Sequence, residues 1–320
     1  MNERATPTDA SDDYLRAALA RCAALPAVRT GVVHPVTATV ITAVAEAAAD
    51  GLIAPVLIGP RARILAAAEE AGVDVAPWEL IDAEHSHEAA DKAAVGAATG
   101  RLDALMKGAL HTDELLSAVV RPQSGLRTER RISHAFVMHI GSYPKPFIIT
   151  DAAINIAPDL ATKADIVQNA ANLWRVAIGG ADETPKVAAL AAVETVNPKM
   201  PATLDAAALS KMAERGQITG ALVDGPLAFD NAISPAAARE KGIVSPVAGQ
   251  ADILLVPDLE AGNMLAKQLS FLGGADSAGI VLGARVPIIL TSRADNMRAR
   301  LLSCALAVVL ADARRTGQLK

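Results

Sequence analysis

The chain has 320 residues, which is enough for about two domains with a substantial core. Hydrophobic residues make up 52% of it but aromatic residues only 2%, so the core has to be built from Ala, Val, Leu and Ile. The net charge of −5, with no run of Lys or Arg, excludes a nucleic-acid-binding surface of the usual basic and aromatic kind.

Two cysteines, Cys22 and Cys304, lie far apart in the sequence and give no disulfide framework. No apolar segment followed by a cleavage site stands near the N-terminus, and the longest apolar run, residues 301–311, is too short to cross a bilayer. We therefore expect a protein of a reducing, cytoplasmic compartment without a membrane partner.

Strand-like and helix-like segments alternate from Tyr14 to about residue 120. Gly51 and Gly72 follow two of the helices, where glycine ends a helix easily because it tolerates the left-handed conformation. The alternation predicts parallel strands with helices on both faces of the sheet. Strands are expected at residues 28–34, 55–59, 80–81 and 104–106, and helices at 37–50, 60–71, 85–99 and 112–120.

Residues 121–131 interrupt this alternation. The segment is polar, and two strand-like runs follow it at 132–140 and 147–150 with only a turn between them, which predicts a hairpin. Alternation then resumes, with helices expected at 161–178, 203–215, 234–241 and 260–272, and strands at 187–193, 219–223 and 253–256. We predict an α/β fold of two domains with mainly parallel sheets, comprising residues 1–135 with 295–320, and residues 136–294, with the active site in the cleft between them.

Residues 279–293, GIVLGARVPIILTSR, contain two short apolar runs typical of buried strands. The second run ends in Thr291-Ser292-Arg293, and a helical pattern follows, predicted as a helix over residues 295–315. Such a junction offers free backbone N–H groups to an anion. Ser292-x-x-Asp295 also fits a capping box, with Asp in place of Glu. The two interpretations are compatible, because a capped helix start can still bind phosphate through Arg293.

Polar clusters follow several of the expected strands, and in open α/β sheets ligands bind beyond the carboxyl ends of strands. His111 opens a helix and is also close enough to Lys107 in the sequence to face the cleft. The arginines at 127–131, including Arg130, border the same cleft. The clusters are Met106-Lys107-Gly108, Thr150-Asp151, Asp224-Gly225-Pro226, Pro257-Asp258 and Thr291-Ser292-Arg293, with Asn155 and Asn263 shortly after two of them.

The familiar cofactor and nucleophile motifs are missing from the sequence: it contains no G-x-G-x-x-G after a strand, no Walker A sequence and no G-x-S-x-G. His85-Ser86-His87-Glu88 could suggest a metal site, but it opens a helix, so we interpret His85 or Ser86 as a cap. We predict no metal.

An ordered series of segments covers most of the chain from about Val32 and resembles the phosphate acetyltransferase/phosphate butyryltransferase family, with a butyryltransferase-like character. The chain also resembles the C-terminal part of proteins fused to an enoyl-CoA hydratase-like domain, which is absent here. The segments are MKGALHTDELL (106–116), ITDAAINIAPDL (149–160), VETVNPKM (193–200), TLDAAALSKMAERGQI (203–218), VDGPLAFDNAIS (223–234), ADILLVPDLEAGNMLAKQL (251–269) and VPIILTSRAD (286–295).

The resemblance implies two domains of the isocitrate/isopropylmalate dehydrogenase-like type, a homodimer, and reversible transfer of an acetyl or butyryl group between CoA and phosphate. CoA is then a substrate, and no cofactor is implied. The resemblance places Ser292 and Arg293 in the active site. Acetate-type members carry an aspartate as the base where this chain has Ala299, so Asp295 is the nearest substitute and Asp151 the second.

The expected chemistry is direct transfer in a ternary complex. Arg293, with Lys107 or an arginine such as Arg130, would neutralise phosphate, and the Ser292 hydroxyl with nearby N–H groups would stabilise the oxyanion. A carboxylate would take the proton of the CoA thiol. Two alternatives remain at this point: a non-catalytic subunit that docks a hydratase-type partner, and a metal- and NAD-dependent dehydrogenase of the same fold.

Overall fold

The computed structural model describes residues 7–180, 182–292 and 295–319. Its contacts divide the chain into two compact units, which we call the terminal unit (Asp12–Arg130 with Ala278–Lys320) and the central unit (built on Arg131–Ser277). The sequence prediction placed residues 278–294 with the second domain instead. The structure groups them with the terminal unit because β11 (Ile288–Ile289) pairs in parallel with β4 (Ala104–Lys107).

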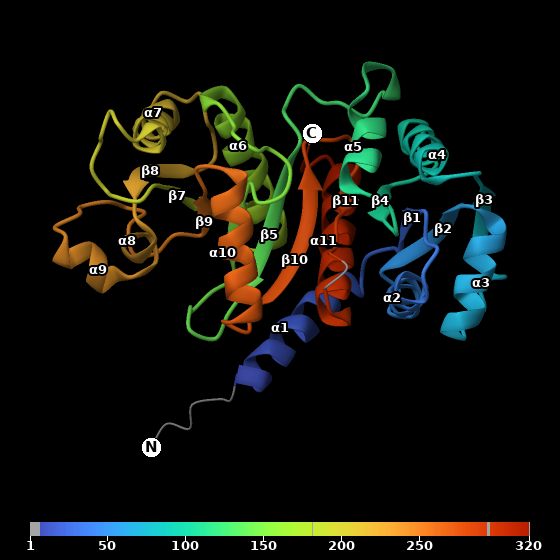
Figure 1. Cartoon of the computed structure of the whole chain (residues 1–320). Helices are drawn as coiled ribbons and strands as arrows, with labels where there is room; N and C mark the ends of the chain where they lie inside the picture. The colour runs from blue at the N-terminus through green and yellow to red at the C-terminus, as the bar shows by residue number, and fades with distance from the viewer. Residues whose placement is uncertain (1–6, 181, 293–294, 320) are drawn as a thin grey trace. The chain divides into compact units, whose positions relative to one another are not determined.

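In the terminal unit the strands follow the order β3-β2-β1-β4-β11-β10; β10 pairs antiparallel with β11, and the other neighbours in this order pair in parallel. Helices α4 and α5 lie on one face of these strands, and α2, α3 and α11 on the other (Figure 1). The elements are α1 (Pro7–Cys22), β1 (Val28–Val33), α2 (Ala38–Ala49), β2 (Ile53–Gly59), α3 (Arg61–Ala71), β3 (Glu79–Asp82), α4 (Ser86–Ala98), β4, α5 (Thr112–Val120), the 3₁₀ helix η1 (Pro122–Ser124), β10 (Asp276–Leu282), β11 and α11 (Met297–Arg315).

The parallel pairing of β1, β4 and β11 decides where the candidate site lies. Because these strands run in the same direction, their carboxyl ends reach the same edge of the sheet. Strand β1 therefore delivers His34 to this edge, β4 delivers Lys107, and β11 delivers Thr291 and Ser292.

In the central unit the strand order is β5-β6-β9-β7-β8, in which β5 and β6 pair antiparallel and the other neighbours pair in parallel. That pair is the hairpin predicted from the sequence. The elements are β5 (Ser133–His139), β6 (Phe147–Thr150), α6 (Leu160–Ala177), β7 (Lys186–Leu190), α7 (Pro201–Glu214), β8 (Leu222–Leu227), α8 (Phe229–Ile233), α9 (Pro235–Glu240), β9 (Ile253–Leu255) and α10 (Leu259–Phe271). The α/β class and the mainly parallel pairing are thus confirmed.

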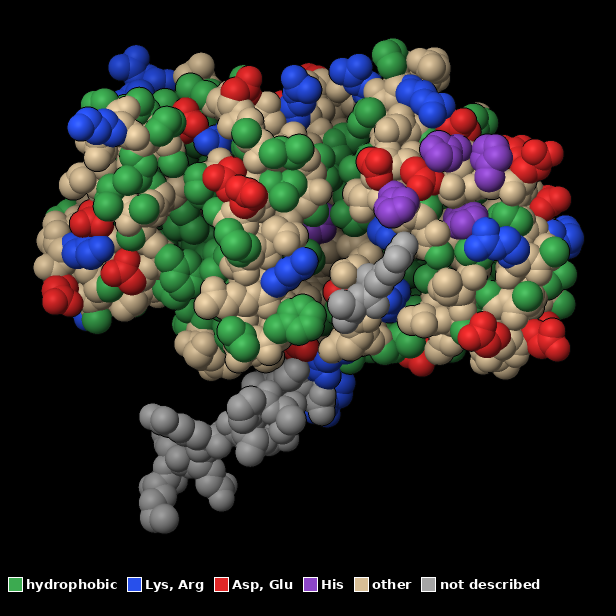
Figure 2. Space-filling model, in the orientation of Figure 1, with side chains coloured by type: hydrophobic (Ala, Val, Ile, Leu, Met, Phe, Trp, Pro, Cys, Tyr) green, Lys and Arg blue, Asp and Glu red, His purple; other side chains and the backbone are tan. Residues whose placement is uncertain are grey.

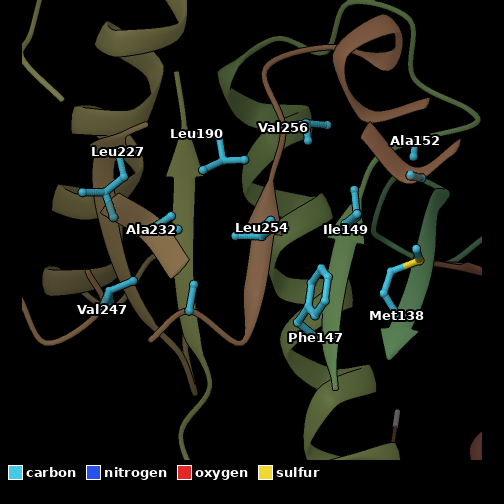
Figure 3. Packing of buried hydrophobic residues seen from close by; sticks show 13 residues of the cluster. Met138, Phe147, Ile149, Ala152, Leu190, Leu227, Ala232, Val247, Leu254 and Val256 are labelled. Carbon is cyan, nitrogen blue, oxygen red and sulfur yellow. The ribbon is translucent and has the colours of Figure 1, made fainter. Parts of the chain in front are cut away.

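The core of the central unit matches the composition. Mostly aliphatic side chains from its strands, helices and loops pack together with few aromatic rings among them (Figure 3). Burying each of the larger side chains contributes roughly 1.5–3 kcal/mol. The labelled members are Met138, Phe147, Ile149, Ala152, Leu190, Leu227, Ala232, Val247, Leu254 and Val256.

One predicted strand end is wrong. The sequence placed Asp224-Gly225-Pro226 beyond a strand, but these residues lie inside β8. Strand β8 pairs only with β7 among the described strands, so its outer edge tolerates a proline without losing a ladder bond. A Cβ on Gly225 would come within 2.6 Å of the Ala189 carbonyl oxygen, so the close approach of the two strands requires glycine here.

Charged side chains of both signs are interspersed over the face shown in Figure 2. That face carries no continuous basic surface, in keeping with the negative net charge of the chain. None of the described helices is both long enough and apolar enough to span a bilayer.

Candidate active site

The loop after β4 is joined to the end of β1 by two backbone hydrogen bonds. The Gly108 N–H donates to the Val33 carbonyl at 2.9 Å, and the Ala109 N–H donates to the His34 carbonyl at 2.9 Å. A Cβ on Gly108 would lie only 2.4 Å from the Val33 oxygen, so no larger residue fits. This contact fixes the backbone on which Lys107 sits.

His34 makes a further contact between the end of β1 and the loop after β4, and it was not singled out from the sequence. It adopts φ = +56°, a left-handed conformation that is uncommon outside glycine, and its Nδ1 lies 3.0 Å from the Ala109 carbonyl oxygen. Burial lowers the pKa of its imidazole. Strained backbone of this kind collects at functional sites. The only sequence signal for it was its place between a strand and Pro35.

The segment after β11 forms a reciprocal turn. The Ser292 N–H donates to Asp295 Oδ2 at 2.6 Å, and the Asp295 N–H donates to the Ser292 carbonyl at 3.2 Å. Helix α11 begins only after this turn, with Asn296 as its N-cap accepting from the Ala299 N–H at 2.9 Å. The predicted capping box was therefore wrong as a helix start, although its two residues do bond to each other. Arg293 lies outside the described residues.

Arg300 holds this turn in place and was missed by sequence reasoning. Its side chain is only 4% exposed. Nε donates to the Asp295 carbonyl at 3.2 Å and Nη2 to the Ser292 carbonyl at 3.2 Å. The sequence did carry a signal for Arg300. It is a charged residue in an otherwise apolar helix, and helical spacing places it beside the buried Cys304.

Asp295 is partly buried, and this burial raises the pKa of its carboxyl above the ordinary value. The Ser292 N–H and the positive charges of Arg300 and Lys107 act in the opposite direction. Lys107 is thus close enough to Asp295 to affect its charge, although its Nζ also donates to the Leu110 carbonyl at 3.1 Å. The Asp295 carboxyl therefore has a higher pKa than an ordinary aspartate, which is the direction that favours a general base.

Lys107, Ser292 and Arg300 line a cavity of about 190 Å³ within the terminal unit. Two cationic side chains and four hydroxyl-bearing residues, together with the first turn of α2, suit a small anion. The lining residues are Thr37, Thr39, Val40, Lys107, Gly108, Ala109, Thr291, Ser292 and Arg300.

Two predicted binding residues of the terminal unit do not line this cavity. His111 is exposed and serves as the N-cap residue of α5, with its backbone N–H 3.5 Å from Glu114 Oε1. Arg130 is half-buried, and its backbone N–H donates to Thr128 Oγ1 at 3.2 Å.

The structure brings together the three site candidates of the central unit. Asp151 is 2% exposed, and its carboxylate accepts from the N–H groups of Ala153 at 3.0 Å and Ile154 at 3.1 Å. Asn155 donates to the same carboxylate from its backbone at 3.2 Å and from Nδ2 at 2.6 Å. Asn263 Nδ2 donates to the Ala152 carbonyl at 3.1 Å. Four donors on one carboxylate indicate that Asp151 organises the loop after β6.

The histidine cluster at the start of α4 acts as expected of a cap. His85 Nδ1 accepts from the Glu88 N–H at 3.1 Å. Across the described parts of the chain, no group of three or more His, Cys, Asp or Glu side chains is arranged to hold a metal ion.

Comparison with known proteins places the chain in a family. The family described as "Phosphate acetyl/butaryl transferase" matches residues 86–308. A phosphate acetyltransferase of Rickettsia prowazekii (strain Madrid E) is 58% identical over 308 residues, covering 94% of this chain and 87% of that protein. A phosphate butyryltransferase of Clostridium acetobutylicum is 42% identical over 272 residues, covering 85% of this chain and 89% of that protein.

Among solved structures, a branched-chain phosphotransacylase from Enterococcus faecalis V583 superimposes with a TM-score of 0.75 at 29% identity. The match covers 88% of this chain and 99% of that one. The chain therefore belongs to the phosphate acetyl/butaryl transferase family.

Proposed function

We propose that this protein is a phosphate acyltransferase, which converts an acyl-CoA and inorganic phosphate into an acyl phosphate and CoA. The observation that carries the proposal is the cation-lined cavity beside the Ser292 turn, in a chain 58% identical to a phosphate acetyltransferase. A reaction between two anionic substrates needs positive charge where they meet, and this cavity supplies it.

The acyl group that we propose is acetyl. The support is the higher identity to a relative named as a phosphate acetyltransferase, 58%, than to one named as a phosphate butyryltransferase, 42%. The competing proposal is a butyryl group, which the butyryltransferase-like character of the sequence motifs favours. The ratio of kcat/KM for acetyl-CoA and butyryl-CoA decides between them, because one or two methylenes in a pocket change this ratio measurably.

We assign the general base to Asp295. In the direction of acyl-CoA formation, its carboxylate takes the proton of the CoA thiol, and the thiolate attacks the carbonyl carbon of the acyl phosphate. The bond from that carbon to the phosphate oxygen then breaks, and the departing phosphate receives the proton. The raised pKa of Asp295 supports this assignment. The four donors on the Asp151 carboxylate argue against the second candidate.

We assign charge stabilisation to Ser292, Arg293 and Lys107. Arg293 enters from the family resemblance of the Ser-Arg pair, and Lys107 from its place on the cavity wall. Their positive charges would offset the charge of phosphate, while the Ser292 hydroxyl would donate to the developing oxyanion. The same resemblance suggests a homodimer, which light scattering of the purified protein tests through the mass in solution.

The test is an assay of the purified chain with CoA and either acetyl phosphate or butyryl phosphate, without added metal or NAD. We expect CoA-dependent phosphate release with matching thioester formation. If the folded protein binds CoA but turns over neither acyl phosphate, the proposed acyltransferase activity is contradicted. That result would favour a non-catalytic interaction subunit.

A further inference from the structure

A second cavity of the terminal unit lies at the edge of the sheet opposite the Ser292 turn. Val28 begins β1, Asp103 directly precedes β4, Val286 lies just before β11, and all three line this cavity. Because these strands are parallel, their amino ends share one edge, about 20 Å from their carboxyl ends, which is the length of the six residues of β1. The second cavity is therefore separate from the 190 Å³ cavity.

The second cavity is large enough for a small organic molecule. Its volume is about 380 Å³, within the range of about 300–1,000 Å³ that small-molecule sites occupy. Its floor is apolar, because the buried side chains of Val28, Val286 and Val308 line it. Val308 belongs to α11. An apolar floor of this size suits a flat ring better than it suits a bare ion.

Two exposed charged groups of opposite sign border this floor. The Arg285 guanidinium donates from Nη1 to the Gly125 carbonyl at 3.0 Å, and its Nε and Nη2 have no acceptor among the described residues. The carboxylate of Asp103 has no hydrogen-bond or ion partner in the described part of the chain. The guanidinium can therefore donate to a phosphate group, while the carboxylate can accept from a hydroxyl.

The end of α11 holds the backbone that carries Arg285. Arg314, in the last turn of this helix, donates from Nη1 to the Arg285 carbonyl and from Nη2 to the Ala284 carbonyl, each at 2.7 Å. Two further charged residues of the lining, Asp312 and Arg315, pair with each other at 2.5 Å and so neutralise each other. The cavity thus combines a fixed cationic border with a buried apolar floor.

We propose that this second cavity binds a free nucleoside monophosphate. The base lies on the valine floor, the phosphate pairs with the Arg285 guanidinium, and a ribose hydroxyl donates to the Asp103 carboxylate. CoA also contains a nucleotide, but in the proposed reaction its thiol has to reach the Ser292 turn at the opposite edge of the sheet. A free nucleotide is therefore the better fit, and its binding does not depend on acyl transfer.

The experiment measures binding of AMP and of adenosine to the full chain by isothermal titration calorimetry. In Arg285→Met we expect the Kd for AMP to rise about tenfold, the scale of one hydrogen bond to a charged group, and the Kd for adenosine to stay within about twofold. Asp103→Ala should weaken both ligands by a similar factor, because both carry the ribose. Arg101→Met is the matched control, since Arg101 is exposed two residues before Asp103 and does not line the cavity.

The substituted side chains are exposed, and the melting temperature checks that each variant is folded. Absence of AMP binding to the wild-type protein at millimolar AMP would overturn the proposal, as would an AMP Kd that Arg285→Met leaves unchanged. A CoA affinity that falls together with the AMP affinity in Arg285→Met would contradict it as well, by assigning the cavity to CoA. Ribose 5-phosphate that binds as tightly as AMP would show that the valine floor holds no base.

Discussion

The side chain of Arg300 reaches back over the first turn of α11 and donates from Nη2 to the backbone carbonyl of Ser292 at 3.2 Å. A second bond from Nε to the Asp295 carbonyl, also at 3.2 Å, closes the contact around the turn. The conformation of the Ser292 turn therefore depends on Arg300, in the first turns of α11, as well as on the reciprocal bonds within the turn.

Replacement of Arg300 by Met should lower the free energy of unfolding by about 2–3 kcal/mol, because the carbonyl groups of Ser292 and Asp295 lose a charged donor that is itself buried. Urea unfolding followed by circular dichroism measures this change. Arg315→Met is the matched control: Arg315 is exposed in the last turn of the same helix, and its loss should cost less than about 0.5 kcal/mol. Equal midpoints for the two variants would show that the Arg300 contacts do not stabilise the fold.

Replacement of Arg293 by Ala should lower kcat by roughly two to three orders of magnitude, the scale of losing one charge-stabilising group. The measurement is steady-state turnover of acetyl phosphate and CoA, with the melting temperature as the check on folding. Turnover close to that of the wild type in a folded variant would remove Arg293 from the mechanism.

Much of the fold followed from the sequence because apolar periodicity and helix-ending glycines are local signals. Helix α5, Thr112–Val120, was predicted with the bounds that the structure shows, and so was the antiparallel pairing of β5 with β6. The start of α11 was not, because Ser292-x-x-Asp295 and Asn296 both offer side chains that can cap. Only the backbone conformation decides which of them begins the helix.

The site was predictable only in part for the same physical reason. Lys107 and Ser292 could be found because each follows an apolar strand in the sequence. His34 and Thr39 could not, since their importance comes from the loop after β4, about 70 residues further along, which meets the end of β1 and the start of α2. Sequence spacing carries no signal for such contacts.

Replacement of Gly108 by Ala should destabilise the fold by about 1–3 kcal/mol, because the new Cβ would lie 2.4 Å from the Val33 carbonyl oxygen. The backbone has to shift, and Lys107 moves with it, so kcat/KM should fall as well. Gly141→Ala is the control, because nothing lies within 4 Å of a Cβ at that position. Unfolding midpoints and turnover of both variants provide the comparison, and an Ala variant as stable and active as wild type would refute the close contact.

Replacement of Asp295 by Asn should keep the turn, since an amide oxygen can still accept from the Ser292 N–H, but should remove the base. Burial raises the pKa of the wild-type carboxyl. The rate of acyl-CoA formation should therefore fall, as the pH is lowered, at a higher pH than an ordinary aspartate would give. The Asn variant should be slow and should lack this acidic limb. A variant with the wild-type pH–rate profile would exclude Asp295 as the base.

The same shift gives Asp295 a second, independent signature in stability. Because burial disfavours the charged carboxylate, the neutral carboxyl contributes stability below the pKa of the unfolded chain, and this contribution is lost as the pH rises through the higher pKa of the folded state. The Asn side chain stays neutral, so the variant should gain stability relative to wild type over that pH range. Urea unfolding at a series of pH values measures the difference. A difference that stays constant across the range would mean that burial does not raise the pKa of Asp295, and the argument for its role as the base would lose its physical support.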